Sequence, residues 1–195
     1  MEHETVNRLI VGITGATGVI LGVRLLQLLQ KTDIETHLII SKWGARTLVH
    51  ETKFSVEAVQ GLAKHNHQIG NQGAPVSSGS FLTRGMVIAP CSVRTLSAIA
   101  NGQSDNLLHR AADVILKERR KLVLLVREAP LNDIHLENML KLSRMGVVIL
   151  PPVAAFYNQP KTLDDIIDHI AMRTLDQFGI HTDVVKRWDG AMKST

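Results

Sequence analysis

The sequence predicts an α/β fold of three layers, an αβα sandwich in which helices cover both faces of a mostly parallel sheet. Three observations support this prediction. Apolar runs alternate along the chain with segments of helical periodicity, which is the rhythm of βαβ units. The run Leu122–Val126 is apolar throughout, as expected for a strand buried on both faces of a parallel sheet. At 195 residues the chain is long enough to bury a full core.

Each element follows from its local pattern. The expected strands are apolar runs, at Leu9–Ile13, Glu35–Ser41, Gly85–Pro90, Leu122–Glu128 and Val147–Pro152. The helices expected between them lie near Val19–Gln30, Ala45–Glu51, Val93–Asn101, Leu107–Arg119 and Ile134–Met145. The last helix has the clearest periodicity, starting behind Thr162, a good N-cap, and reaching Phe178.

We expect one domain over residues 1–195, with a core over 9–180 and a C-terminal tail over 181–195. The segment Gln68–Ser80 is rich in Gly, Ser and Pro, which predicts a long surface loop. Neither an internal repeat nor a linker divides the chain.

Composition narrows the classes of function. The net charge is +4, and the basic run Lys117–Lys121 has no interleaved aromatic residue, which favours a solvated helix end over a nucleic-acid surface. The single cysteine, Cys91, excludes an internal disulfide and is consistent with a reducing compartment. No apolar stretch approaches membrane length, and the first residues are acidic rather than signal-like. We therefore expect a cytoplasmic protein that binds neither nucleic acid nor membrane.

A glycine-rich turn follows the first expected strand and opens a helix, with the sequence GITGATG over residues 12–18. Its backbone can approach a ligand closely at Gly15, Ala16 and Thr17, and the helix start attracts phosphate. The spacing is neither the dinucleotide fingerprint nor a P-loop. Ser41 stands where a dinucleotide site would place an acidic residue, which favours a mononucleotide. The alternative is a turn that only tightens the packing of strand and helix.

A second turn, PCSVRT over residues 90–95, follows the third expected strand. Ser92 and Thr95 can cap a helix, or donate to a phosphate or a flavin edge, and this segment favours neither role. Cys91 is expected to be a small buried filler, because no neighbouring motif supplies a histidine base for a nucleophile. The nine histidines form no HExxH motif and no close pair on one helical face, so no metal site is expected.

The fourth expected strand ends in an adjacent cation and anion, Arg127 and Glu128, before Pro130. Ligands of open α/β sheets bind at the carboxyl ends of the strands. A fixed Arg beside a carboxylate can hold an anionic substrate and move a proton. A surface ion pair is the competing interpretation.

Together these residues closely resemble the UbiX/Pad family of flavin prenyltransferases, in the branch that accompanies phenolic-acid decarboxylases. The resemblance runs from Leu9 to Trp188 and rests on several motifs in order: GITGATG, ISKW, APCS, DNLLHRAADVILKERRKLVLLVRE, PLNDIHLENMLKLSRMG and PPVAAFYNQP. It implies a flavodoxin-like, Rossmann-like fold and a large homo-oligomer, typically a dodecamer. It also implies metal-independent transfer of a dimethylallyl group from dimethylallyl phosphate to N5 and C6 of reduced FMN. The product, prenylated FMN, would serve a partner decarboxylase of the 4-hydroxybenzoate or vanillate type.

The resemblance also assigns roles to residues of this chain. It implies flavin contacts from the glycine turn (Gly15, Ala16 and Thr17) and from Ser41, Ser92, Thr95 and Arg127. It implies contacts to the prenyl phosphate from Lys117, Arg127, Tyr157 and Arg173. The matching catalytic residues are the carboxylates Glu51 and Glu128 together with Thr17, which keeps the hydroxyl of the serine that some relatives carry in the turn.

Two other functions remain open at this point. One is an FMN-dependent decarboxylase of the related cysteine-decarboxylase superfamily, which needs no second phosphate pocket. The other is a non-catalytic subunit that binds flavin and delivers it to a decarboxylase. Release of CO2 from a peptidyl cysteine would identify the first, and flavin binding without turnover would identify the second.

Overall fold

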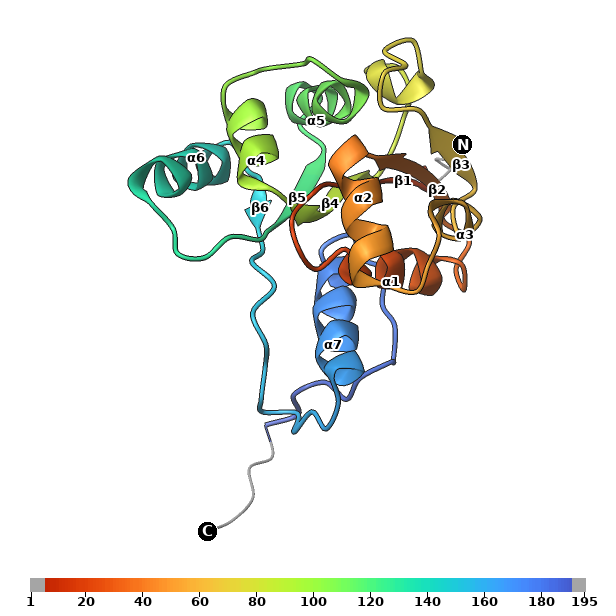
Figure 1. Ribbon diagram of the computed structural model, residues 1–195, viewed down its shortest axis with the longest axis vertical. Coiled ribbons are helices and arrows are strands. Elements are labelled where there is room, and N and C mark those ends of the chain that lie inside the picture. Colours follow the sequence, from red (N-terminus) through yellow and green to blue (C-terminus); the bar gives the residue numbers. More distant parts are fainter. Residues whose placement is uncertain (1–5, 191–195) are drawn as a thin grey trace, which may run out of the picture.

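A computed structural model of the chain describes residues 6–190. Its strands form one parallel sheet in the order β3-β2-β1-β4-β5-β6 (Figure 1). The strands are β1 (Arg8–Ile13), β2 (Glu35–Ile40), β3 (His65–His67), β4 (Gly85–Cys91), β5 (Lys121–Val126) and β6 (Val148–Ile149). The helices are α1 (Ile20–Leu29), α2 (Lys42–Glu51), α3 (Val56–Gln60), α4 (Val93–Ala100), α5 (Leu107–Lys117), α6 (Asp133–Arg144) and α7 (Leu163–Asp176), with a 3-10 helix at Pro75–Ser77.

The strand order identifies the type of α/β sheet. Leaving aside the edge strand β3, the order of the other strands is second, first, third, fourth, fifth along the chain. This is the doubly wound order of flavodoxin. The predicted fold class is therefore confirmed, with β3 added at one edge.

The core lies in two layers, one on each face of the sheet, because successive strand residues point to opposite sides. Leu9 and Val11 pack with apolar residues of α1 and α7 on one face. Ile10 and Met86 pack with α4 and α5 on the other, together with Leu142 of α6. Figure 1 shows the same division, with α4, α5 and α6 on one side of the sheet and α1 and α7 on the other.

Two predicted strands are shorter than expected at their carboxyl ends. The strand predicted at Val147–Pro152 comprises only Val148–Ile149. Leu150 N still donates to Leu124 O at 2.9 Å, but the two prolines that follow have no N–H to extend the ladder. The strand predicted to reach Glu128 ends at Val126, which leaves Arg127 and Glu128 in the connection beyond the sheet.

Two further local predictions were wrong, one on where a helix starts and one on the burial of a loop. Helix α2 starts at Lys42 rather than Ala45, because the Ser41 side chain caps it by accepting a hydrogen bond from Gly44 N at 2.9 Å. The loop predicted at Gln68–Ser80 is not wholly on the surface. Ala74 and Val76 are buried at 3% and 1% exposure in the same core layer as α5.

The end of the described chain packs beside α7. Arg187 donates from Nη1 and Nη2 to the two carboxylate oxygens of Asp176, each at 2.8 Å. The Trp188 ring contacts Tyr157 edge-on at 5.6 Å. The hydrogen bonds from Arg187 are the main reason why the pKa of Asp176 falls to about 2. The part of the predicted tail within 181–190 is thus held by specific contacts, and 191–195 lie outside the described residues.

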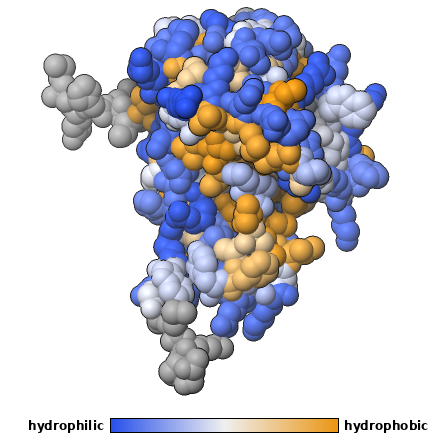
Figure 2. Space-filling model, turned by 90° about the vertical axis from the view of Figure 1, so that its left-hand side faces the viewer, coloured by the Kyte–Doolittle hydropathy of each residue, from blue (hydrophilic) through white to orange (hydrophobic). Residues whose placement is uncertain are grey.

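One side of the molecule exposes many apolar side chains. Figure 2 shows this side, which carries α6 and the segment after β6, with an apolar band running along it. The exposed apolar residues on these segments include Leu131, Ile134, Leu136, Leu140, Met145, Val153 and Phe156. A band of this kind on a folded protein marks an interaction surface. Among the described residues, no helix has the length and apolar character needed to cross a membrane.

Candidate active site

Helices α1, α2 and α4 each begin at the carboxyl edge of the sheet. Ile13 at the end of β1 pairs with Ile40 at the end of β2, and Cys91 at the end of β4 pairs with Val126 of β5. These strands lead into α1, α2 and α4, so three N-terminal sets of N–H groups lie along one edge. The chain leaves β1 for β2 on one side, while β4 lies on the other. This is the topological switch point at which such sheets bind ligands.

Thr14 joins the two turns that flank the switch point. Its Oγ1 donates to Pro90 O at 2.7 Å and accepts from Ser92 N at 2.9 Å, and the residue is 2% exposed. Sequence reasoning did not single out this residue. The signal that could have identified Thr14 was its position, a polar side chain between the apolar strand and Gly15. A buried hydroxyl there needs hydrogen-bond partners.

The glycine turn is both tightly packed and accessible. A Cβ atom on Gly15 would lie 2.4 Å from Trp43 Cβ, so glycine is required for α2 to pack against the turn. Gly15 and Thr17 are nevertheless exposed, and Ala16 is half-buried. The packing role and the ligand role that the sequence left open are therefore compatible at this turn.

Glu51 lies against the same turn. Its Oε2 accepts hydrogen bonds from Gly18 N at 2.8 Å and from Val19 N at 3.3 Å. Val19 is the N-cap of α1 and makes no capping bond with its own side chain. The last residue of α2 thus caps the first turn of α1, with the negative charge at the favourable end of the helix dipole.

We expect Glu51→Ala to lower the free energy of unfolding by about 1 kcal/mol, the usual effect of losing a helix cap. Glu51→Gln should lower it less, because an amide oxygen can still accept from Gly18 N. Denaturation in urea of the two variants measures the difference. Glu137→Ala on the exposed face of α6 is the control, and equal losses in all three variants would argue against the capping role.

The second turn forms a side-chain cap for α4. Ser92 Oγ accepts from Thr95 N at 3.3 Å and lies 3.2 Å from Thr95 Oγ1. Both hydroxyls stand at the N-terminus of the helix, where an anion would also bind. Cys91 before them is fully buried, and burial raises the pKa of its thiol. The prediction that Cys91 is a small buried residue is confirmed.

Arg127 and Glu128 follow β5 at the same edge, and both side chains are exposed. Arg127 N donates to Cys91 O at 3.0 Å, which fixes the backbone beside the second turn. Glu128 Oε1 accepts from Ala129 N at 3.1 Å. Within residues 6–190 the two side chains form no ion pair with each other, so the surface ion pair considered as the alternative is absent.

The remaining predicted residues do not all meet within one chain. Tyr157 Oη lies 2.7 Å from His169 Nε2 on α7, and Arg173 stands one turn further along that helix, so these two lie in one neighbourhood. Arg173 Nη1 pairs with Asp176 at 3.0 Å. Lys117 pairs with Glu118 at the far end of α5.

Lys117 and Arg173 lie toward the amino edge of the sheet. Lys117 ends α5 just before β5, whose first residue, Lys121, pairs with the first residue of β4. Arg173 stands in the last turn of α7. Just beyond this helix, Phe178 O accepts a hydrogen bond at 3.3 Å from Nη1 of Arg84, the residue immediately before β4. Arg127 lies at the opposite edge, so a site that uses all these cations has to be completed by a second chain.

Comparison with known proteins identifies relatives of the chain. A family model described as Flavoprotein matches residues 1–175. A probable UbiX-like flavin prenyltransferase of Bacillus subtilis is 56% identical over 186 residues, which are 95% of this chain and 91% of that protein.

Two solved structures share the fold over nearly the whole chain. One is a dodecameric FMN-dependent UbiX-like decarboxylase from Escherichia coli O157:H7, with a TM-score of 0.93, 55% identity, and coverage of 94% of this chain and 100% of that one. The other is AnUbiX (PadA1) in complex with FMN and dimethylallyl pyrophosphate, with a TM-score of 0.94, 48% identity, and coverage of 96% and 100%. With the flavodoxin-type sheet, the glycine turn at its switch point and this identity over nearly its full length, the chain belongs to the UbiX-like flavin prenyltransferase family.

Proposed function

We propose that this protein is a flavin prenyltransferase that joins a dimethylallyl group from dimethylallyl phosphate to N5 and C6 of reduced FMN. The prenylated FMN would pass to a partner decarboxylase of phenolic acids, of the 4-hydroxybenzoate or vanillate type. The observation that carries the proposal is the switch point itself. Three helix N-termini meet there, and β2 is followed by the N-cap Ser41 rather than by an acidic residue that would bind the ribose of a dinucleotide.

The residues at this edge fit FMN. The helix starts and the exposed turn at Gly15, Ala16 and Thr17 offer N–H groups to its phosphate. Ser41, Ser92 and Thr95 offer hydroxyls nearby, and Arg127 offers a cation from the end of β5. When bound and reduced, FMN supplies the nucleophilic N5 and C6 atoms.

The other assigned side chains act on the prenyl donor and on the proton. Lys117, Arg127, Arg173 and the Tyr157 hydroxyl hold the phosphate through charge-assisted hydrogen bonds, which stabilise it as it leaves. Closing the new ring requires a proton to leave C6. Glu128 is exposed and not ion-paired in the described part of the chain, so it is available as the base.

A homo-oligomer, a dodecamer in this proposal, would bring the donor pocket together. Lys117 and Arg173 lie toward the amino edge, away from Arg127, and the apolar band on α6 gives neighbouring chains a surface on which to dock (Figure 2). The dodecameric relative supports assembly of this kind. We place the protein in the cytoplasm, in keeping with one buried, reduced thiol.

The test uses the purified protein with FMN, a reductant and dimethylallyl phosphate, followed by mass spectrometry of the extracted flavin. We expect the flavin to gain the mass of one C5 prenyl unit. Recovery of bound but unmodified FMN would instead indicate a flavin-delivery subunit. Release of CO2 from a peptidyl cysteine, without flavin modification, would indicate a decarboxylase.

A further inference from the structure

A cluster of histidines and a carboxylate lies on the two strands farthest from β6, outside the candidate active site. Glu35 and His37 alternate along β2, and His65 and His67 alternate along β3, with His37 in register with His65. Because strand residues two apart share a face, all four side chains lie on one side of the sheet. Sequence reasoning tested histidine spacing on helices and so did not consider this pattern.

The ligand atoms of three of these residues converge. Glu35 Oε1 lies 3.2 Å from His37 Nε2 and 2.9 Å from His65 Nε2, and the three atoms lie within 4.8 Å of one another. In a tetrahedral zinc site with bonds of about 2.0–2.1 Å, neighbouring ligand atoms are roughly 3.3 Å apart. The three ligand atoms are thus close enough for one ion, once the exposed His65 ring turns out of its stack on His37 so that both imidazole lone pairs point at the ion.

Neighbouring side chains, His67 and Arg8, orient these three residues in the way that residues hydrogen-bonded to metal ligands do in known metal sites. His67 Nε2 lies 3.0 Å from His37 Nδ1, so it can accept the proton on Nδ1 and leave Nε2 with its lone pair. Arg8 Nε contacts the second carboxylate oxygen of Glu35, Oε2, at 3.4 Å, which leaves Oε1 for the ion.

The cluster is rigid on one side and open on the other. His37 is 3% exposed, and its ring stacks on those of His65 and His67 at centroid distances of 4.7 and 5.2 Å. The side chains of His65 and Glu35 are 45% and 35% exposed, which provides a path for the ion and room for a water ligand.

We propose that Glu35, His37 and His65 bind one divalent transition-metal ion of the Zn2+ type, with His67 as an outer partner. Two imidazoles and one carboxylate suit zinc and its neighbours rather than Mg2+ or Ca2+, which prefer oxygen ligands. Glu35 begins β2 and Ser41 follows its end, about 20 Å away at the rise of a strand. The ion therefore acts on the fold, by clamping the short edge strand β3 to β2, and takes no part in prenyl transfer.

The test uses the full chain without an affinity tag, stripped with a chelator and titrated with Zn2+ by calorimetry and with Co2+ by visible absorption. We expect one ion per chain, a cobalt spectrum of low coordination number, and a melting temperature raised by Zn2+. His65→Gln should weaken Zn2+ binding at least about a hundredfold, and His67→Gln about ten- to a hundredfold. His65 is exposed, so the melting temperature of its metal-free variant should stay close to that of the metal-free parent.

The matched control is His135→Gln, which replaces a half-buried histidine in the capping box of α6 where Gln can also form the box. This variant should bind Zn2+ as the parent does. Equal Zn2+ affinity in the parent and in His65→Gln, an octahedral cobalt spectrum, or no binding at all would overturn the proposal. Each of these results would leave the four side chains as a hydrogen-bonded network alone.

Discussion

Glu128→Gln is expected to slow prenyl transfer by about two to four orders of magnitude, the span typical of a general acid–base group. FMN affinity should be nearly unchanged, because an amide oxygen can still accept the hydrogen bond from Ala129 N. Single-turnover kinetics with saturating FMN and dimethylallyl phosphate measures the chemical step, and fluorescence titration measures FMN binding. Glu51→Gln should slow the step less, because Glu51 accepts hydrogen bonds at the start of α1 and an amide oxygen can still accept them.

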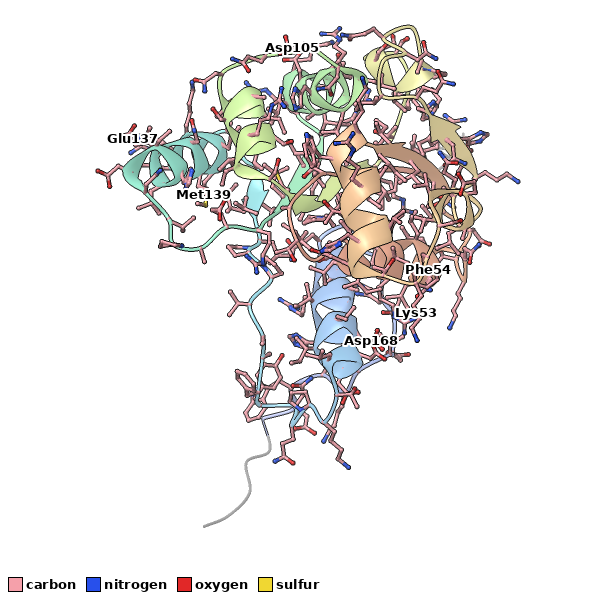
Figure 3. All side chains as sticks on the ribbon, viewed as in Figure 1. Lys53, Phe54, Asp105, Glu137, Met139 and Asp168 are labelled. Atoms are coloured by element: carbon pink, nitrogen blue, oxygen red, sulfur yellow. The ribbon has the colours of Figure 1, made fainter. Side chains whose placement is uncertain are left out.

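Glu137→Gln is the matched control for Glu128→Gln, since it makes the same exchange on an exposed residue. Glu137 projects from α6 away from the sheet (Figure 3). This variant should turn over at the parental rate. A Glu128→Gln enzyme with near-normal turnover would show that another group, such as the departed phosphate, accepts the proton.

Arg173→Ala is expected to weaken the use of dimethylallyl phosphate by about ten- to a hundredfold, which corresponds to one lost charge-assisted hydrogen bond of roughly 1.5–3 kcal/mol. FMN binding should be unaffected. The fold should also persist, because Asp176 keeps Arg187 at 2.8 Å and His181 at 3.0 Å. The measurements are KM for the donor and the affinity for FMN. Raised salt should mimic the loss only slightly if the pocket is shielded from solvent.

Arg187→Ala removes the other arginine from the same carboxylate and so controls for the loss of an Asp176 contact. Here we expect reduced stability, because Arg187 makes the hydrogen bonds that most lower the pKa of Asp176, but an unchanged KM for the donor. If both variants raise KM equally, Arg173 acts by holding Asp176 and the C-terminal segment rather than by binding phosphate.

The elements that the sequence predicted well are those with a long local pattern. The apolar run Leu122–Val126 and the periodic helix behind Thr162 formed as expected. Strand β3 escaped prediction because its three residues, His65–His67, are polar and gain their conformation from pairing with β2. Helix α3 has five residues, too few for a periodic signal.

Some residues of the candidate site could likewise be placed from local sequence patterns, and others could not. The turn residues Gly15, Ser41 and Ser92 could be placed from sequence, because each follows a strand, and Ser41 and Ser92 also cap the helix that comes next. The relation of Lys117 to Arg127 could not be placed from sequence, because the two residues stand at opposite ends of β5 and one chain does not bring them together. The ligand cluster at His65 depended on strand register, which local patterns do not contain.

The separation of Lys117 and Arg173 from Arg127 also governs how a measured rate should be interpreted. A pocket completed between chains makes turnover subject to mass action, since a dissociated chain keeps its flavin edge but lacks part of the donor pocket. Specific activity then becomes a function of dilution, and a fall at low concentration reports the equilibrium between chains. Mixing one variant substituted at Arg127 with another substituted at Lys117 or Arg173 should likewise restore turnover that neither variant shows alone.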